Sequence, residues 1–281
     1  MRRVGKTTLR LCGSLITAAV LGVCAENPDA AQIVQRSLAV NALDWKAQPG
    51  YSHRECDRKA DQSKCYQILM VDGSPYSRLV EINGQPLTPA QEQQEQAKLN
   101  REIDRRRHES PSDRQARISK YESNRAEQHM LMQQMAAAFH FSLRGEEMID
   151  GVDSYVLDAT PDPGYRPPIE KARVLLGMRG RLWIDKEHYH WVRVQAEVIN
   201  PIEFGCFVAK VKPGTKFELR QARVGDVWLP KRFSESVNAS VLGVYGMHSR
   251  EEELYSDYEP VQASAAKFTS IAASARIAAP H

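Results

Sequence analysis

Two cysteines, Cys56 and Cys65, flank a short polar segment and could form a disulfide bond. The intervening sequence DRKADQSK is typical of a hairpin loop, and strand-like stretches lie on both sides of it. A disulfide across a loop of this length would stabilise the fold by about 2–3 kcal/mol. A metal site is the alternative, and the absence of a CxxC motif counts against it. In an exported protein we expect the two cysteines to be oxidised, and Cys206, in an apolar run, to be a buried free thiol.

Two histidines, His188 and His190, could share one face of a strand or turn and hold a metal ion, but no third ligand is near them in the sequence. The sequence contains no GxSxG, no HExxH and no GxGxxG after a strand. The segment Gly5–Thr8 resembles the end of a Walker A loop, but the upstream glycine of that motif would fall before Met1. The sequence therefore predicts no catalytic residue, no metal site and no cofactor.

The first 25 residues have the features of a secretion signal. A basic start is followed by the apolar run Leu11–Val23, which is shorter than the ~20 residues of a membrane span. Small residues precede Glu26, so we expect cleavage there and a mature protein that is periplasmic or secreted, with no transmembrane span. The alternative is a lipobox that ends at Cys24, with acylation of its thiol. The valine before Cys24 is unusual for that motif, so a membrane-anchored lipoprotein is less favoured.

Charge counts argue against a nucleic-acid partner. The whole chain has 38 Lys+Arg and 35 Asp+Glu, and four of the basic residues lie in the signal segment. The mature chain is therefore almost neutral and has no basic footprint for nucleic acid. Residues 26–260 are expected to form a single domain, and the Ala/Ser-rich segment 261–281 a mobile tail.

The first half of the mature chain combines helices with three strands. A helix is predicted from the N-cap Asp29 to Trp45, with Ile33, Val34, Leu38 and Leu43 near one face. Strands are predicted around 50–56, 64–71 and 76–82, with tight turns at Asp72-Gly73 and Asn83-Gly84. A capping box at Thr88–Gln91 begins a helix to about residue 107, and Ser110 begins a second to about residue 139. We therefore expect a helical insertion at about 88–140.

The second helix of the insertion becomes apolar towards its end, at Met132, Met135 and Phe139. Methionine is adaptable, so such a stripe suits a variable apolar ligand, although ordinary core packing explains it as well. The basic cluster at 105–108 could bind anionic head groups, but a solvated helix face is the favoured interpretation.

From Phe141 onwards apolar residues alternate with polar ones. Short segments of this kind, separated by turn residues, predict an antiparallel meander. The apolar positions include Leu182/Ile184, Val192/Val194 and Phe217/Leu219. Together with the helices they indicate an α+β fold that is mainly antiparallel β.

Two segments of this half carry a family resemblance. Gly180–Val198 reads GRLWIDKEHYHWVRVQAEV, and Gly225–Lys231 reads GDVWLPK. The first resembles a strand–turn–strand unit of the outer-membrane lipoprotein-carrier (LolA-like) family, and the second resembles a strand start in lipoprotein-sorting relatives. The resemblance covers most of the mature chain in the order of its elements. It implies an incomplete, curved β-barrel, a half-barrel, with an N-terminal helix and a helical lid over an apolar cavity.

The expected function is that of an exported lipid- or lipoprotein-binding protein of the bacterial envelope. It would act as a monomer and hold acyl chains under the lid. The ligand-binding residues would be Met132, Met135, Phe139, Leu182, Ile184, Val192, Val194, Phe217 and Leu219. The alternative is a non-catalytic sensing or envelope-assembly module with a packed core and an envelope protein partner.

Overall fold

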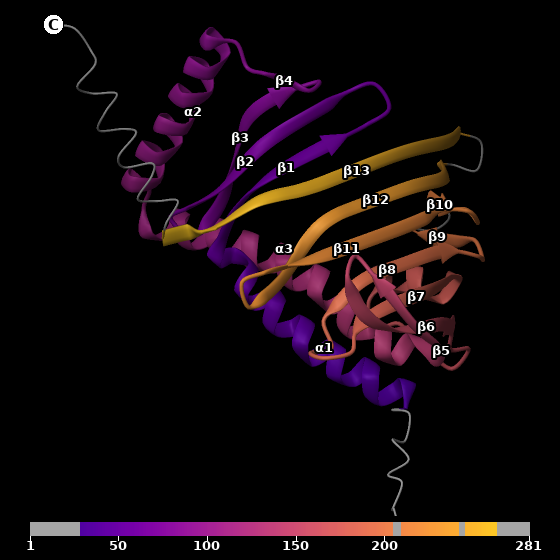
Figure 1. The fold of residues 1–281 in the computed structure, drawn as a ribbon. Coiled ribbons are helices and arrows are strands. Elements are labelled where there is room, and N and C mark those ends of the chain that lie inside the picture. The colour runs from indigo at the N-terminus through magenta and orange to yellow at the C-terminus, as the bar shows by residue number, and fades with distance from the viewer. Residues whose placement is uncertain (1–28, 205–208, 242–244, 263–281) are drawn as a thin grey trace, which may run out of the picture.

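The computed structural model describes residues 29–204, 209–241 and 245–262 (Figure 1). The predicted signal peptide, Cys24, Cys206 and nearly all of the predicted tail lie outside these residues.

Within the described residues, thirteen strands form one antiparallel sheet. The main path runs in the order β4-β3-β2-β1-β13-β12-β11-β8-β7-β6-β5, and the pair β9–β10 attaches beside β12. The strands are β1 (Tyr51–Arg58), β2 (Ser63–Val71), β3 (Ser74–Ile82), β4 (Gln85–Pro86), β5 (Phe139–Ile149), β6 (Val152–Pro161), β7 (Met178–Asp185), β8 (Trp191–Val198), β9 (Ile202–Phe204), β10 (Ala209–Val211), β11 (Lys216–Val224), β12 (Val227–Val241) and β13 (Tyr245–Pro260).

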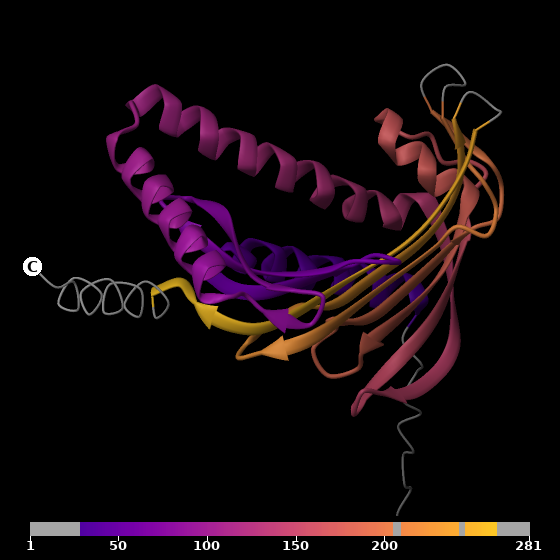
Figure 2. The ribbon, with the colours of Figure 1, turned by 90° about the horizontal axis from the view of Figure 1, so that it is seen from above.

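The sheet does not close into a barrel, because β4 and β5 lie at its two ends and do not pair with each other. Figure 2 shows the sheet bending around the helices, with the magenta helix α3 crossing its hollow side. The predicted fold class, a curved and incomplete antiparallel barrel with an N-terminal helix and further helices, is confirmed.

Tight turns set the register of the N-terminal strands. Asp72 and Gly73, and likewise Asn83 and Gly84, have positive φ angles, as the two-residue hairpin turns of type I′ require. Gly73 is also constrained by packing, because an added Cβ would lie 2.9 Å from Ile118 Cδ1. The turn between β2 and β3 is therefore in close contact with a helix far along the chain.

Three α-helices begin at predicted caps. Helix α1 (Ala30–Ala47) begins after Asp29, α2 (Pro89–His108) after the capping box of Thr88, and α3 (Pro111–Ala138) after Ser110. Short 3-10 helices η1 (Gln48–Gly50) and η2 (Glu170–Gly177) complete the set. Helices α2 and α3 occupy the range expected for the insertion.

One large apolar cluster joins the sheet to the helices. It contains Leu157, Leu182 and Ile184 of the sheet, Ile33 and Val34 of α1, and residues of α3 and η2. We call the sheet face that carries Leu157 and Leu182 the inner face, and the opposite face the outer face. A smaller apolar cluster contains Trp183, Val192 and Trp228.

Helix α1 packs on the inner face partly through polar residues. Its buried positions include Ser37, Asn41 and Asp44 as well as Ile33 and Val34. Leu43, which the sequence placed on the packed face, is 65% exposed. Ser37 and Asp44 face the sheet instead of Leu43, because their side chains hydrogen-bond to residues of the sheet, as described below.

Candidate functional site

The inner-face cluster brings together most of the predicted ligand-binding residues. Leu182 and Ile184 are fully buried in it, and Phe139 is buried at the start of β5. Met132, Met135, Val194 and Phe217 are half-buried and pack against it. Leu219 pairs directly with Val194 and therefore shares its face. Apart from Leu219, these side chains belong to or pack against one apolar cluster, which also includes residues of α1 and η2.

Val192 does not belong to this surface. The pairing of β7 with β8 shifts register between Trp183 and Ile184, so that Val192 is an extra residue in the ladder. A β-bulge of this kind changes the face of the side chains on either side of it. Val192 is buried with Trp183 and Trp228 in the smaller cluster. The expectation that Val192 and Val194 line one wall is therefore wrong.

Helix α1 is fixed to the sheet by hydrogen bonds of buried groups. Asp44 Oδ2 lies 2.7 Å from His190 Nδ1, and Asp44 Oδ1 accepts a hydrogen bond from the backbone N–H of Trp228 at 3.1 Å. Trp191 Nε1 donates to Ser37 Oγ at 3.1 Å. These bonds make α1 a rigid part of the inner face.

His188 and His190 have different surroundings. His190 is largely buried against Asp44, and its ring stacks on Trp228 with centroids 5.5 Å apart. His188 is exposed, beside Asp185. Among the described residues no group of three or more potential ligands is arranged to hold a metal ion. The contact with Asp44 gives His190 a structural role.

The hairpin of α2 and α3 is fixed to the turn between β2 and β3. Arg106 is buried and donates to the backbone oxygens of Val71 at 2.6 Å and Ser74 at 2.8 Å. Arg117 donates to Ser74 Oγ at 2.6 Å. Arg106 also pairs with Glu102 at 2.6 Å. Hydrogen bonds from Arg105 and then Arg106 lower the pKa of Glu102 to about 2. Arg106 therefore differs from the solvated helix face that the sequence indicated for the 105–108 cluster.

The middle of α3 is held to α1 by an aromatic contact. His129 stacks on Trp45 with ring centroids 4.3 Å apart, and the Arg125 guanidinium lies 4.3 Å from the Trp45 ring centroid. Burial and the nearby Arg125 and Lys46 charges lower the pKa of His129. A neutral histidine fits this contact, because the cation Arg125 lies beside it.

Most of α3 is only partly buried. Of its residues whose burial the structure describes, Ala138 is buried, and the others are exposed or half-buried. Ile118, Leu131, Met132 and Met135 are half-buried apolar side chains along the helix. The helix therefore resembles a cover that is held near Arg117, at the Trp45 contact and at Ala138, with half-buried methionines between the last two points.

The inner face becomes acidic towards β1, β12 and β13. Glu235 shares this face because it pairs with Phe217, and Glu251 and Asp57 lie close to it across the neighbouring strands. Burial and then the neighbouring carboxylates raise the pKa of Asp57 and of Glu235. The apolar part of the inner face is therefore concentrated on the β5–β8 side and β11.

One pocket on the sheet has no lining residue from the helices. It has a volume of about 1340 Å³ and is lined mainly by charged side chains of the outer face. Of the predicted ligand-binding residues, Phe217 alone is among those that line it. A second pocket, of about 830 Å³, is lined by His188, His190 and Val192 near the β7–β8 turn. No sequence pattern predicted the outer-face pocket.

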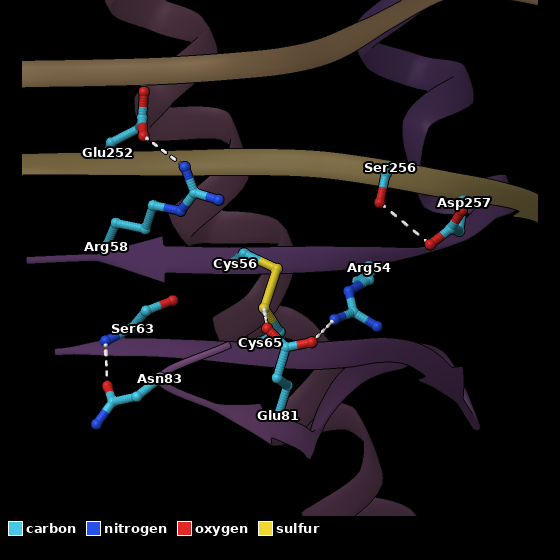
Figure 3. Close-up of a disulfide and its surroundings, with 10 residues drawn as sticks. All are labelled: Arg54, Cys56, Arg58, Ser63, Cys65, Glu81, Asn83, Glu252, Ser256 and Asp257. Carbon is cyan, nitrogen blue, oxygen red and sulfur yellow. Dashed lines mark hydrogen bonds and ion pairs between the residues drawn. A yellow bond between two sulfur atoms is a disulfide. The ribbon is translucent and has the colours of Figure 1, made fainter. Parts of the chain in front are cut away.

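The cysteine pair has the predicted geometry. Cys56 and Cys65 are directly opposite each other on β1 and β2 and form a disulfide, with Cα atoms 4.0 Å apart (Figure 3). Arg54 and Glu81 form an ion pair of 2.6 Å beside it. The predicted disulfide is confirmed.

The sequence matches no protein-family model and no curated protein at a significant level. Among solved structures, it is similar to a DUF1329 family protein from Desulfovibrio piger, with 11% identity, a TM-score of 0.31 and coverage of 83% of this chain and 94% of that one. A putative outer membrane lipoprotein-sorting protein domain from Vibrio parahaemolyticus has 13% identity and a TM-score of 0.31, over 80% and 92% of the two chains. The MucA/MucB complex of Pseudomonas aeruginosa has 12% identity and a TM-score of 0.24, over 80% and 93%.

All three similarities are distant, with identities of 13% or less. In the part of the chain that the structure describes, no helix has the length and apolar character needed to cross a membrane.

Proposed function

We propose that this protein is an exported, non-catalytic binding protein of the bacterial envelope that holds an acyl chain between the inner face and helix α3. The observation that carries the proposal is the half-buried methionine stripe near the end of α3. Met132 and Met135 pack against the apolar cluster that contains Leu182 and Ile184. The ligand would be a lipid or the acylated end of a lipoprotein.

Methionine suits a cover of this kind. Its unbranched, polarizable side chain can repack around an empty or an occupied space. Because α3 is anchored by Arg117 near its start, by His129 on Trp45 and by Ala138 at its end, the methionine side chains between His129 and Ala138 can repack while the hairpin stays attached. Each methylene of an acyl chain removed from water contributes ~0.8 kcal/mol, so even partial enclosure gives measurable binding.

A fluorescent fatty-acid titration tests the proposal. We expect saturable binding by the wild-type protein and a loss of affinity of about tenfold or more in Met132→Glu and Met135→Glu, because each places a charge in the apolar surface. Met148→Glu is the matched control, because Met148 is 66% exposed on β5 and should bind like the wild type. Equal binding by all these variants, or no binding at all, would contradict the proposal.

The alternative is a module with a packed core that recognises a protein partner. One observation favours it: a charged pocket of about 1340 Å³ is on the outer face, away from the helices. In the titration this alternative predicts no saturable fatty-acid binding by the wild-type protein.

A further inference from the structure

The outer-face pocket is a groove that crosses the strands. Its outer-face lining comes mainly from two adjacent side-chain rows on seven consecutive strands, from β6 through β7, β8, β11, β12 and β13 to β1, with Arg144 added from β5 and Arg232 from a third row. At ~4.8 Å per strand spacing, seven strands span about 29 Å. The groove is therefore long enough for about nine residues of an extended peptide at ~3.3 Å per residue.

Cations outnumber carboxylates on the outer-face lining. Asp158, Glu197, Glu218 and Glu252 are the acidic side chains of the groove that lie on this face. Seven Lys and Arg side chains accompany them. Glu235 and Glu251 also border the groove but belong to the inner face, where Lys59 pairs with Glu251 at 3.0 Å.

Most of the carboxylates are shared between several guanidinium groups. Glu218 contacts Arg193 at 2.6 Å, Arg220 at 2.7 Å and Arg232 at 3.8 Å. Burial opposes the ionisation of Glu218, but hydrogen bonds from Arg193, Gln195 and Arg220 outweigh it and lower its pKa to about 2. Because each guanidinium has five N–H donors, one carboxylate cannot satisfy three of them. Arg193 Nε is buried and has no hydrogen-bond partner among the described residues.

A second row has two cations that make no ion pair within the described part of the chain. Lys216 and Arg250 flank Ser236 in register on β11, β12 and β13. Both are exposed, and neither makes an ion pair with a residue that the structure describes. Across the sheet in the same row, Arg179 pairs with Glu197 at 2.9 Å. This row therefore presents unneutralised positive charge along one side of the groove.

We propose that the groove binds an acidic, extended peptide segment of a partner protein. Arginine forks match carboxylates in a planar, bidentate geometry. The guanidinium of Arg232, which lines the groove, is recessed, with a side chain 39% exposed, and Arg193 and Arg220, which share Glu218 with it, are 20% and 27% exposed. A narrow chain can reach recessed groups, whereas a flat bilayer surface cannot. The segment 261–281 of the chain itself contains no acidic residue, so it lacks the complementary charge.

Fluorescence polarisation with a labelled peptide of about ten glutamates tests this inference on the lipid-free protein. We expect saturable binding that weakens as salt is added, and no binding of a matching lysine peptide. The double variant Lys216→Glu/Arg250→Glu should lower the affinity by about tenfold or more, and its fold should persist because neither side chain has a partner to lose. The control Arg101→Glu/Lys120→Glu makes the same charge change on exposed positions of α2 and α3 and should stay within about twofold of the wild type.

Three results would overturn the inference. The first is equal peptide binding by both double variants, and the second is no saturable binding at low salt. The third is binding of phosphatidylglycerol vesicles that depends on Lys216 and Arg250 while the peptide does not bind, which would assign the groove to a membrane surface. Fatty-acid binding takes no part in these readouts, so the inference stands or fails separately from the proposed function.

Discussion

His190 Nδ1 lies 2.7 Å from Asp44 Oδ2, so the segment that leads into β8 is hydrogen-bonded directly to the last turns of helix α1. The same carboxylate also accepts from the Trp228 backbone at the start of β12. One buried side chain thus holds α1 to two segments that are distant in sequence. Through α1 and its contact with His129, it also supports the position of α3.

Replacing Asp44 should loosen this junction. In Asp44→Ala the N–H groups of His190 and Trp228 lose their acceptor, and we expect the free energy of unfolding to fall by about 2–3 kcal/mol. Urea unfolding followed by circular dichroism measures it. Leu43→Ala is the control, because Leu43 is the exposed neighbour and should change stability by less than about 0.5 kcal/mol. Equal effects of the two changes would show that Asp44 has no special role.

The disulfide should contribute to stability through the unfolded state. We expect Cys56→Ser/Cys65→Ser to lower the free energy of unfolding by about 2–3 kcal/mol, because the closed loop restricts the unfolded chain. Thermal unfolding with and without reductant measures this. Reduced wild-type protein should unfold close to the double variant. Peptide mapping without reductant that recovers both thiols free would contradict the prediction.

Arg106 should control how firmly the α2–α3 hairpin is attached. Arg106→Ala leaves the backbone oxygens of Val71 and Ser74 without their donor, so the hairpin should open more often. We expect faster hydrogen exchange and proteolysis across α2 and the first turns of α3, with β5–β8 unchanged. Arg107→Ala, at the exposed neighbouring position, should behave like the wild type. Unchanged exchange in Arg106→Ala would remove the basis for an anchored cover.

Glu218 should make the free energy of unfolding depend on pH in the acidic range. Its pKa is lowered from 4.5 to about 2 in the folded state, so its contribution is complete above pH 4.5 and is lost as the pH falls through about 2. Glu218→Gln should cost on the order of 1–3 kcal/mol at neutral pH, and the difference from the wild type should shrink between pH 4.5 and 2.

Denaturant unfolding at several pH values measures that difference. Glu187→Gln, at a side chain 82% exposed, is the control and should follow the wild type throughout. A constant gap between Glu218→Gln and the wild type over this pH range would contradict the assignment.

Local sequence signals predicted the elements well, because they act over a few residues. The caps at Asp29, Thr88 and Ser110 begin the three helices, and the Asp72-Gly73 and Asn83-Gly84 turns connect the first strands. The alternation predicted Leu182 and Ile184 on one face of the sheet. This prediction held because the extra residue at the register shift, Val192, is on β8, so β7 itself stays regular.

The predictions from sequence were wrong where tertiary contacts determine the position of a side chain. Val192 changes face through a bulge that only the pairing of β7 with β8 reveals. Leu43 was expected on the packed face of α1, but its neighbour Asp44 is buried instead, because the Asp44 carboxylate accepts from two donors there. No sequence pattern predicted the cationic groove, because its arginines, such as Arg179, Arg232 and Arg250, come from three separate strands, β7, β12 and β13. Each alone resembles an ordinary solvent-facing strand residue.

The central claim is that an acyl chain lies between α3 and the inner face, and photolabelling with a diazirine-bearing fatty acid tests it most directly because it reports position. The account predicts labelled peptides that contain Met132 and Met135 of α3, together with Leu182 and Ile184 of β7, and loss of this labelling in Met132→Glu but not in Met148→Glu. Absence of labelling, or labelling confined to outer-face peptides, would contradict it.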